Sequence, residues 1–370
     1  MKKSNYSTSI LWGILIFLVA AGLVNAFLLT NHVYHLAKDV KAHREDYMSP
    51  LLPDPGKTAA TNKNENGAKV STGIYLDRIE ELDIKQSRWT YEFYLWFKWK
   101  PNEIDLLGEK HEKFQNELPF NIVNGEIISA DLIEKQIDRE KNTGYIQYQV
   151  KAKTTQFFDV RLFPIDEHYL IVPIEHKWLD RGDVIFIPDT LESKLSSRVM
   201  IPGYTITKSI KLIEKAHAYQ SARGNPKFSS TDMENFSQFR AGIKITKNGL
   251  PDILKLFLIN FIAVIVTFIA PFSPDPSRYT VGAIFTTAGA NYILASKLPA
   301  SHVYTFAEII NTYCSIVIII MMALLAIVPA VIMKDGKSEK IEKRLNNAIM
   351  ISMFLIFIIT TALLNWAVLN

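Results

Sequence analysis

The chain has 370 residues, of which 48% are hydrophobic and 21% charged, and its mean hydropathy of +0.08 is above that of a typical soluble enzyme. The net charge of +4 is too small to predict a nucleic-acid partner, and the single cysteine, Cys314, excludes an internal disulfide and a cysteine-based zinc site. Only six charged residues lie between Pro251 and Met333. This segregation of apolar residues predicts a membrane protein with a large polar domain.

The N-terminal segment, residues 1–37, reads as a transmembrane anchor or a signal peptide. Its uncharged run Ile10–Leu29 covers about 30 Å as a helix, the thickness of the hydrocarbon core. A cleaved secretory signal is the alternative, because Lys2 and Lys3 precede the run and Val24–Ala26 resembles a cleavage site. The run is longer than the apolar core of most signals, which favours the anchor. In both cases the domain that follows is exported.

Residues 38–69 are expected to form a helix and then a flexible linker. Helix-forming residues continue up to Pro50, and Pro53–Lys69 is rich in Asn, Gly, Lys and Thr. A new domain should therefore begin at Val70.

Residues 70–249 have the character of a β-sandwich. The stretch Arg88–Lys98 is packed with aromatic and β-branched residues, and turn residues separate it from other short apolar runs. The remaining predicted strands are Gly73–Glu80, Gly144–Lys151, His168–Glu175, Asp183–Ile187 and Gly242–Thr246.

Residues 250–370 predict a four-helix transmembrane domain, because apolar spans in lipid must be helical. The spans lie at about 250–270, 279–295, 305–333 and 347–369. The connector 334–346 carries five Lys/Arg residues and is expected on the cytoplasmic side, which places the sandwich outside. We therefore expect a multi-pass protein of a bacterial inner membrane with a periplasmic sandwich. The sequence has no nucleophile elbow, phosphate loop, paired-carboxylate site or metal-ligand spacing, so we expect no enzyme, no catalytic residue, no cofactor and no metal.

Local motifs add a family resemblance. The run Phe158–Asp166 contains Phe163-Pro164-Ile165-Asp166, Trp99 is followed by Pro101-Asn102, and Leu298-Pro299 ends the second span after the sandwich. With the architecture, these strings make the chain similar to the pentameric ligand-gated ion channels (the Cys-loop receptor superfamily), in the bacterial type that lacks the disulfide. The resemblance covers about Val70–Leu369.

The resemblance implies a homopentamer in a lipid bilayer that passes small monovalent ions when a small molecule or an ion binds outside the membrane. It does not name that ligand. It also implies a coupling interface in which Phe163, Pro164 and Asp166 press on the loop that contains Leu298 and Pro299.

The resemblance makes the span near 279–295 the pore helix, and two registers are open. Counting back from Leu298-Pro299 places Phe285 at a mid-pore apolar ring; counting from Arg278 turns a different face to the axis. The first count is preferred because a ring of that kind can gate by dewetting. The first face is Gly282, Phe285, Gly289, Tyr292 and Ser296, and the second is Thr280, Ile284, Thr287 and Asn291.

Two charges at the predicted cytoplasmic mouth bear on ion selectivity. Asp275 favours cations, whereas Arg278 favours anions if it points into the pore. Arg278 can instead pair with Asp275. Selectivity for cations is therefore slightly preferred, and the sign of the permeant ion stays open.

The ligand pocket of the family lies between neighbouring sandwiches and is lined by aromatic residues that suit amines through cation–π attraction. The same aromatic residues can equally fill the core of a sandwich. His168 and His176 are more readily explained by structural roles or pH sensitivity than as metal ligands. The aromatic residues at the matching positions are Phe120, Trp178, Tyr219 and Phe228 from one subunit and Tyr94 from the next.

Three departures keep a second function open, a non-conducting membrane sensor or signalling scaffold with the same fold. The N-terminal anchor is not part of the usual receptor, the first channel span lacks the family's mid-helix proline, and the pore helix is rich in glycine.

Overall fold

A computed structural model describes residues 4–53, 66–108, 114, 118–219, 235–247, 249–273, 275–298, 303–334 and 339–369. The chain divides into two compact units. One is helical and comprises Met1–Val40, Val160–Asp166 and Asn248–Asn370; the other is β-rich and comprises Lys41–Asp159 and Glu167–Lys247. The turn at 160–166, which the sequence analysis placed inside the sandwich domain, therefore groups with the helices.

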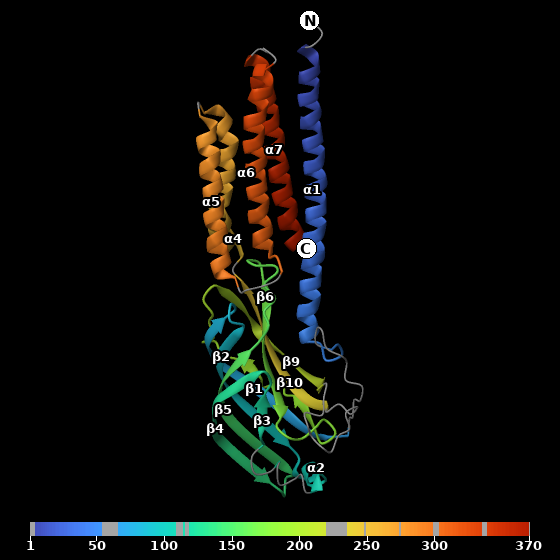
Figure 1. The fold of residues 1–370 in the computed structure, drawn as a ribbon. Coiled ribbons are helices and arrows are strands. Elements are labelled where there is room, and N and C mark those ends of the chain that lie inside the picture. Colours follow the sequence, from blue (N-terminus) through green and yellow to red (C-terminus); the bar gives the residue numbers. More distant parts are fainter. Residues whose placement is uncertain are drawn as a thin grey trace. The chain divides into compact units, whose positions relative to one another are not determined.

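The β-rich unit contains two sheets (Figure 1). Their strands pair mainly antiparallel, but β1 pairs parallel with β7 and β8, so one sheet is mixed. That sheet has the order β4-β5-β2-β1-β7, with β8 on β1, and is built from β1 (Ala68–Asp83), β2 (Arg88–Trp99), β4 (Gly125–Asp138), β5 (Thr143–Thr155), β7 (Val184–Pro188) and β8 (Lys194–Leu195). The second sheet has the order β3-β6-β10-β9 and is built from β3 (Phe120–Ile122), β6 (Glu167–His176), β9 (Tyr204–Ala218) and β10 (Asn235–Lys247).

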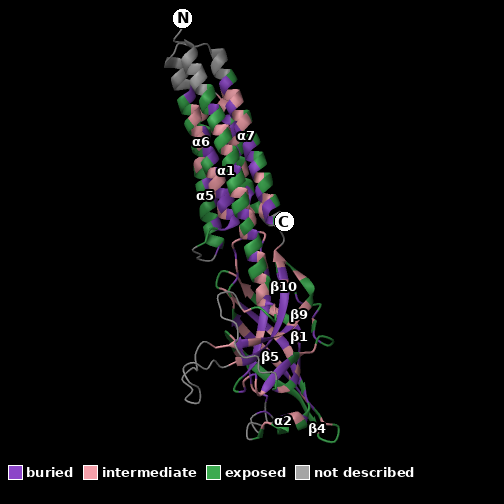
Figure 2. Cartoon of the chain, turned by 90° about the vertical axis from the view of Figure 1, so that its right-hand side faces the viewer, coloured by how far each residue is buried: buried purple, intermediate pink, exposed green. Residues whose placement is uncertain are grey.

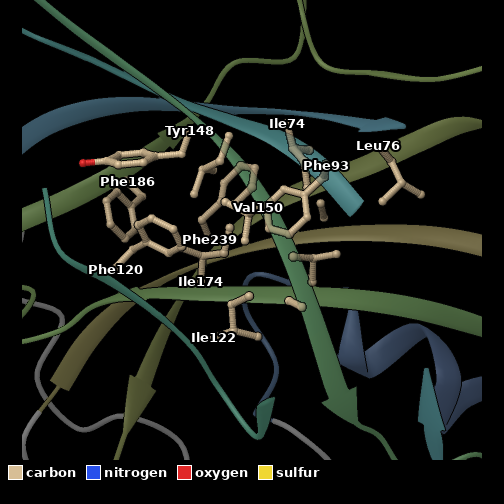
Figure 3. Packing of buried hydrophobic residues seen from close by; sticks show 14 of the residues in the cluster. Ile74, Leu76, Phe93, Phe120, Ile122, Tyr148, Val150, Ile174, Phe186 and Phe239 are labelled. Carbon is tan, nitrogen blue, oxygen red and sulfur yellow. The ribbon is translucent and has the colours of Figure 1, made fainter. Parts of the chain in front are cut away.

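The core of this unit lies between the sheets, and β2 shows why the sequence folds this way. Its odd-numbered residues Trp89, Tyr91, Phe93, Leu95 and Phe97 are all fully buried, as expected for one face of a strand. Figure 3 shows aromatic rings from both sheets meeting in this core. Burying this much aromatic and aliphatic surface provides the main drive for folding.

Strand β4 is the exception, because it is exposed along both faces (Figure 2). It lies at the edge of its sheet and pairs only with β5 over most of its length. β4 was not predicted from the sequence, because a strand with no buried face lacks the alternating pattern that identifies strands.

The helical unit contains α1 and four further long helices, which run alongside one another in Figure 1. By length and composition, α1, α4, α6 and α7 are the described helices that are apolar enough to cross a membrane, and α5 is not. A short 3-10 helix, η2 (Ala270–Phe272), separates α4 from α5. The long helices are α1 (Ser4–Tyr47), α4 (Gly249–Ile269), α5 (Pro276–Lys297), α6 (Phe306–Lys334) and α7 (Glu339–Leu369); a further short helix, α2 (Pro101–Asp105), belongs to the β-rich unit.

The connector before the last span is shorter than expected. α6 runs to Lys334 and α7 begins at Glu339, about eight residues before the predicted span at 347–369. Lys and Glu favour helices and can extend a membrane span beyond the apolar core. The six strands predicted from the sequence correspond to β1, β2, β5, β6, β7 and β10; β3, β4, β8 and β9 were not predicted.

Helix α1 continues without interruption across the possible cleavage site after Ala26. Within the helical unit it contacts α7: a Cβ atom on Gly22 would lie 3.1 Å from Ile356, and the rings of Tyr34 and Trp366 stack with 6.2 Å between their centroids. The helix ends at Tyr47, just before Pro50, as the sequence predicts.

Candidate functional site

Helix α5 has two unlike faces. One is buried within its own chain against α4 and α6, and it consists of Thr280, Ala283, Thr287, Ala290 and Leu294. The opposite face is exposed and consists of Gly282, Phe285, Gly289, Tyr292 and Ser296. Phe285 is 74% exposed, and neither glycine would bring a Cβ atom within 4 Å of another residue.

The two pore registers therefore differ in how many of their residues are buried by other helices of the same chain. In the register counted from Arg278, Thr280 and Thr287 are buried, and their hydroxyls donate to backbone oxygens of α5 itself. All members of the register counted from Leu298 are exposed. The face counted from Leu298 is thus open to a neighbouring subunit or to water, whereas in the face counted from Arg278 Asn291 alone is exposed and Ile284 is half-buried.

The exposed face of α5 also differs from that of α4. On α4 the exposed residues from Leu258 onward are apolar and include Ile262, Ile265 and Ile269, while Lys255 is exposed one turn earlier. Such a stripe suits contact with lipid. The exposed side of α5 carries Gly, Thr, Asn and Ser residues, which explains why α5 does not qualify as a membrane span by hydropathy.

At the start of α5 the two opposite charges form an ion pair. Arg278 Nε lies 2.7 Å from Asp275 Oδ2, and Ser277 Oγ donates to Asp275 Oδ1 at 2.7 Å. The pair is solvent-exposed and therefore weak. Asp275 and Arg278 thus lie beside each other at this end of α5, and whether cations or anions pass stays a prediction.

The Phe163–Asp166 turn docks on the start of α6. The backbone oxygens of Arg161 and Phe163 accept hydrogen bonds from Phe306 N (2.8 Å) and Ala307 N (3.1 Å). These are N–H groups of the first helical turn, which have no partner inside the helix. The Phe163–Pro164 peptide bond is cis, and Phe163, Pro164 and Asp166 are buried.

The same helix end carries a capping box. Glu308 accepts hydrogen bonds from Thr305 N (2.8 Å) and Thr305 Oγ1 (2.9 Å), and Glu308 N donates to Thr305 Oγ1 at 3.3 Å. Leu298, at the end of α5, is buried, and Pro299 lies outside the described residues. The described contact of the turn is thus with the residues directly after the predicted loop, and the contact with Leu298 and Pro299 stays a prediction.

Within one chain, the described aromatic residues proposed for a ligand site between subunits lie in different surroundings. Phe120 belongs to the core of the sandwich, where Figure 3 shows it with Phe186, Phe239 and Tyr148. Burial in the core is the alternative role weighed above for these residues. Tyr94 is half-buried beside Tyr75, with 6.4 Å between ring centroids.

The remaining members of that set are differently placed. Trp178 is 55% exposed, with Lys177 Nζ 5.2 Å from its ring centroid, so its ring is open to a partner. Tyr219 is half-buried and donates to a carboxylate, as described below. Phe228 lies outside the described residues.

The two histidines named above are structural within the β-rich unit. His176 Nδ1 accepts hydrogen bonds from Trp178 N (3.2 Å) and Leu179 N (3.0 Å), which fixes the turn after β6. Burial lowers the pKa of His176 to about 4. The His168 ring packs edge-on against Phe158 with 5.3 Å between centroids.

A polar cluster on the outer face of the β3-β6-β10-β9 sheet was not predicted from the sequence. Glu175 is 3% exposed, and its oxygens lie 2.6 Å from His217 Nδ1, 2.7 Å from Gln238 Nε2 and 2.8 Å from Tyr219 OH. Gln238 Oε1 in turn accepts a bond from Arg240 Nε. The signal was present as polar residues at alternate positions of β9 and β10.

The last residues of α1 and Met48, which follows it, cover part of this face. Arg240 Nη1 donates to Tyr47 O at 2.8 Å and Lys215 Nζ to Asp46 O at 3.0 Å, while Met48 packs with Ile171 and Ile213. Beside these contacts lies a pocket of about 210 Å³, which we call the outer-sheet pocket. It is bounded by Tyr47, Phe157, Ile171, His217, Gln238 and Arg240, among others.

No group of three or more His, Cys, Asp or Glu side chains within the described residues is arranged to hold a metal ion. Comparison with models of protein families and with curated proteins finds no match to this chain.

Proposed function

We propose that this protein is a homopentameric ion channel of an inner membrane, in which α5 of each subunit lines the pore and a ligand signal from the β-rich unit controls it. Small monovalent ions would pass, with cations slightly preferred. Four apolar helices support membrane placement. The pore, the ligand control, the pentamer and the periplasmic side of the β-rich unit belong to the proposal.

The observation that carries the proposal is the pair of faces on α5. This helix packs on α4 and α6, yet its exposed face carries Gly and Ser beside Phe285 and Tyr292, and the helix as a whole is not apolar enough to cross a membrane by itself. A symmetric ring of subunits resolves the conflict, because it turns that face toward a shared water-filled axis. The face of one helix cannot enclose such a path, so the channel requires an oligomer.

Control by the β-rich unit is supported by the docking of the 160–166 turn. This turn lies directly between β5 and β6 in the sequence, and its carbonyl groups bond the first turn of α6. α6 in turn packs on α5. A shift of the turn would therefore be passed to the pore helix through two packed elements.

A non-conducting membrane sensor is the second candidate, and one observation favours it. Phe285 and Tyr292 are both large and at least 74% exposed on the proposed pore face. Repeated five times, the two rings would form two apolar constrictions, which is more than a single gate requires.

Recordings from purified full-length protein in planar bilayers test the proposal. Amines, amino acids, protons and calcium are applied in turn from the side of the β-rich unit. A pentamer that passes current with at least one of them supports the channel. A pentamer that stays silent, together with silence of Phe285→Ala and Tyr292→Ala variants, favours the sensor; a species other than a pentamer contradicts both.

A further inference from the structure

The outer-sheet pocket lies within the β-rich unit and plays no part in the pore or in the proposed coupling turn. Twelve described residues line it. Several of their polar side chains are already engaged within the chain: the guanidinium of Arg240 donates to Tyr47 O and to Gln238 Oε1, and the amide of Gln156 is bonded through both its nitrogen and its oxygen. These groups build the wall, and we assign no ligand to them.

His217 differs from these groups, because one of its ring nitrogens is unused. Its Nδ1 lies 2.6 Å from Glu175 Oε1, whereas Nε2 forms no hydrogen bond with the described part of the chain. The ring is 9% exposed and lines the pocket. Nε2 is therefore a polar atom of the lining that remains for a ligand.

The hydrogen bonds behind His217 indicate which ring nitrogen carries the proton. Gln238 Nε2 (2.7 Å) and Tyr219 OH (2.8 Å) also donate to Glu175, which is 3% exposed and does not itself line the pocket. An ionised carboxylate can only accept hydrogen bonds, so we assign the ring proton to Nδ1. The neutral ring then presents an acceptor lone pair at Nε2, and its orientation is fixed before any ligand arrives.

The charges around the pocket favour a neutral ligand. No acidic side chain is among the twelve described lining residues, and the guanidinium of Arg240 is held by other groups of the chain. An ion that entered would lose its hydration without gaining a counter-charge. The ligand should therefore be uncharged and should carry a hydrogen-bond donor for His217 Nε2.

Another part of the lining is apolar. It comprises Phe157, Ile171, Pro173 and Val123, and Phe157 is 70% exposed. An exposed phenyl ring offers a face on which a flat ring can stack in an offset or edge-on arrangement. The volume of about 210 Å³ is below the 300–1,000 Å³ usual for drug-sized ligands. The ligand should therefore be small, with about one ring.

We propose that the outer-sheet pocket binds a small phenol, whose hydroxyl group donates to His217 Nε2 and whose ring contacts Phe157. A phenol is neutral, has one donor and carries the flat ring that the apolar lining suits. Binding does not depend on conduction, so this inference goes beyond the proposed function and does not rest on it. A silent pentamer that binds the phenol would contradict the channel alone.

Fluorine NMR of the full-length protein in nanodiscs tests the site. The probe is 4-fluorophenol, and 4-fluorotoluene carries a methyl group of similar size that cannot donate; empty nanodiscs measure the partition of both into lipid. We expect saturable binding of 4-fluorophenol about fivefold tighter than that of 4-fluorotoluene, because one neutral hydrogen bond is worth about two- to tenfold. Equal or weaker binding of the phenol, or no saturation at millimolar concentration, overturns the proposal.

Nitrogen NMR of protein with ¹⁵N-labelled histidine tests the acceptor directly. The Nε2 signal of His217, assigned as the one missing from a His217→Gln variant, should shift when 4-fluorophenol is added and stay in place with 4-fluorotoluene. An Nε2 signal that does not respond to a saturating concentration of the phenol overturns the assignment of His217.

Two variants place the site without disturbing the buried hydrogen bonds. Phe157→Ala removes the exposed ring, and Thr155→Trp fills the mouth from an exposed strand position. Each should weaken binding of 4-fluorophenol about threefold or more, while Leu191→Ala, at an 81% exposed position outside the pocket, should leave it unchanged. A pocket variant that binds the phenol as tightly as the wild-type protein refutes the site.

Discussion

His176 shows how one buried side chain can make stability depend on pH. Its ring must stay unprotonated at Nδ1 to accept two backbone N–H groups, and burial lowers its pKa from 6.5 to about 4. Between those values the unfolded chain takes up a proton that the folded chain does not. Folding stability should therefore fall as the pH drops from 6.5 to 4, and this contribution should be constant below 4.

We expect this histidine to cost about 2 kcal/mol of stability between pH 7 and pH 5. His176→Asn keeps an acceptor for the two N–H groups and cannot titrate, so its stability should fall less over that interval. Urea unfolding of both proteins at the two pH values, followed by tryptophan fluorescence, measures the difference. Parallel losses in the two proteins would exclude His176 as the source.

Phe285 is the residue on which the proposed gate depends. Five phenyl rings at one height would exclude water, with Gly282 and Gly289 leaving space one turn away on each side. Phe285→Ala should raise the basal current several-fold and Phe285→Ser more, while Ile284→Ala should change it little. Single-channel recording in bilayers provides the measurement. A pore opened by Ile284→Ala or Thr287→Ala, and not by Phe285→Ala, would require the other register.

At the scale of elements, the segment after α1 is docked on β10 through a glycine. A Cβ atom at Gly242 would lie 2.6 Å from Met48 Cε, so a side chain there would force the buried Met48 side chain to move. Gly242→Val should cost about 1–3 kcal/mol of stability by overpacking. In a Met48→Ala background the same change should cost much less, because the clash is gone. Thermal unfolding of the four proteins gives the coupling energy, and simple additivity would argue against this contact.

The turn at 160–166 is the second element with a testable role. Asp166→Ala or Pro299→Ala should leave the oligomer intact and shift agonist sensitivity, because each alters the surroundings of the α6 start and not the core of the sandwich. Dose–response curves in bilayers measure the shift, with size-exclusion chromatography as the assembly control. Wild-type sensitivity in both variants would contradict the coupling role.

At the scale of the whole molecule, the N-terminal helix should remain attached. α1 is continuous from Ser4 to Tyr47 and contacts α7 on both sides of Ala26. Mass spectrometry of membrane-extracted protein should therefore recover peptides from before Ala26. A mature N-terminus at Phe27 would show that the segment is a cleaved signal, and a pentamer would then have twenty spans in place of twenty-five.

How far the sequence predicts this architecture depends on the kind of signal each element carries. The long helices and β2 were predictable, because apolar length and period-two alternation are local properties. Strand β4 was not, since both of its faces are exposed. Which residues of α5 are exposed could not be predicted from the sequence either, because the two registers of a helix rich in small residues show similar patterns of apolar and polar residues.

The parts of the candidate site also differ in how far the sequence predicts them. The Phe163–Asp166 turn was visible as a motif, but its hydrogen bonds to Phe306 and Ala307 join residues about 140 positions apart. The outer-sheet pocket needs β6, β9, β10 and the end of α1 in one place. Such a site exists only once the strands have paired, so no local pattern predicts it.

The unusual composition of α5 has a consequence for biosynthesis. A helix without enough apolar residues to cross the membrane by itself gains little free energy when it moves from the translocon into lipid without its neighbours. It needs α4 and α6 to cover Thr280 and Thr287 before it meets lipid. We therefore expect α4, α5 and α6 to enter the bilayer as one packed group, so that a nascent chain ending after α5 would fail to hold that helix in the membrane.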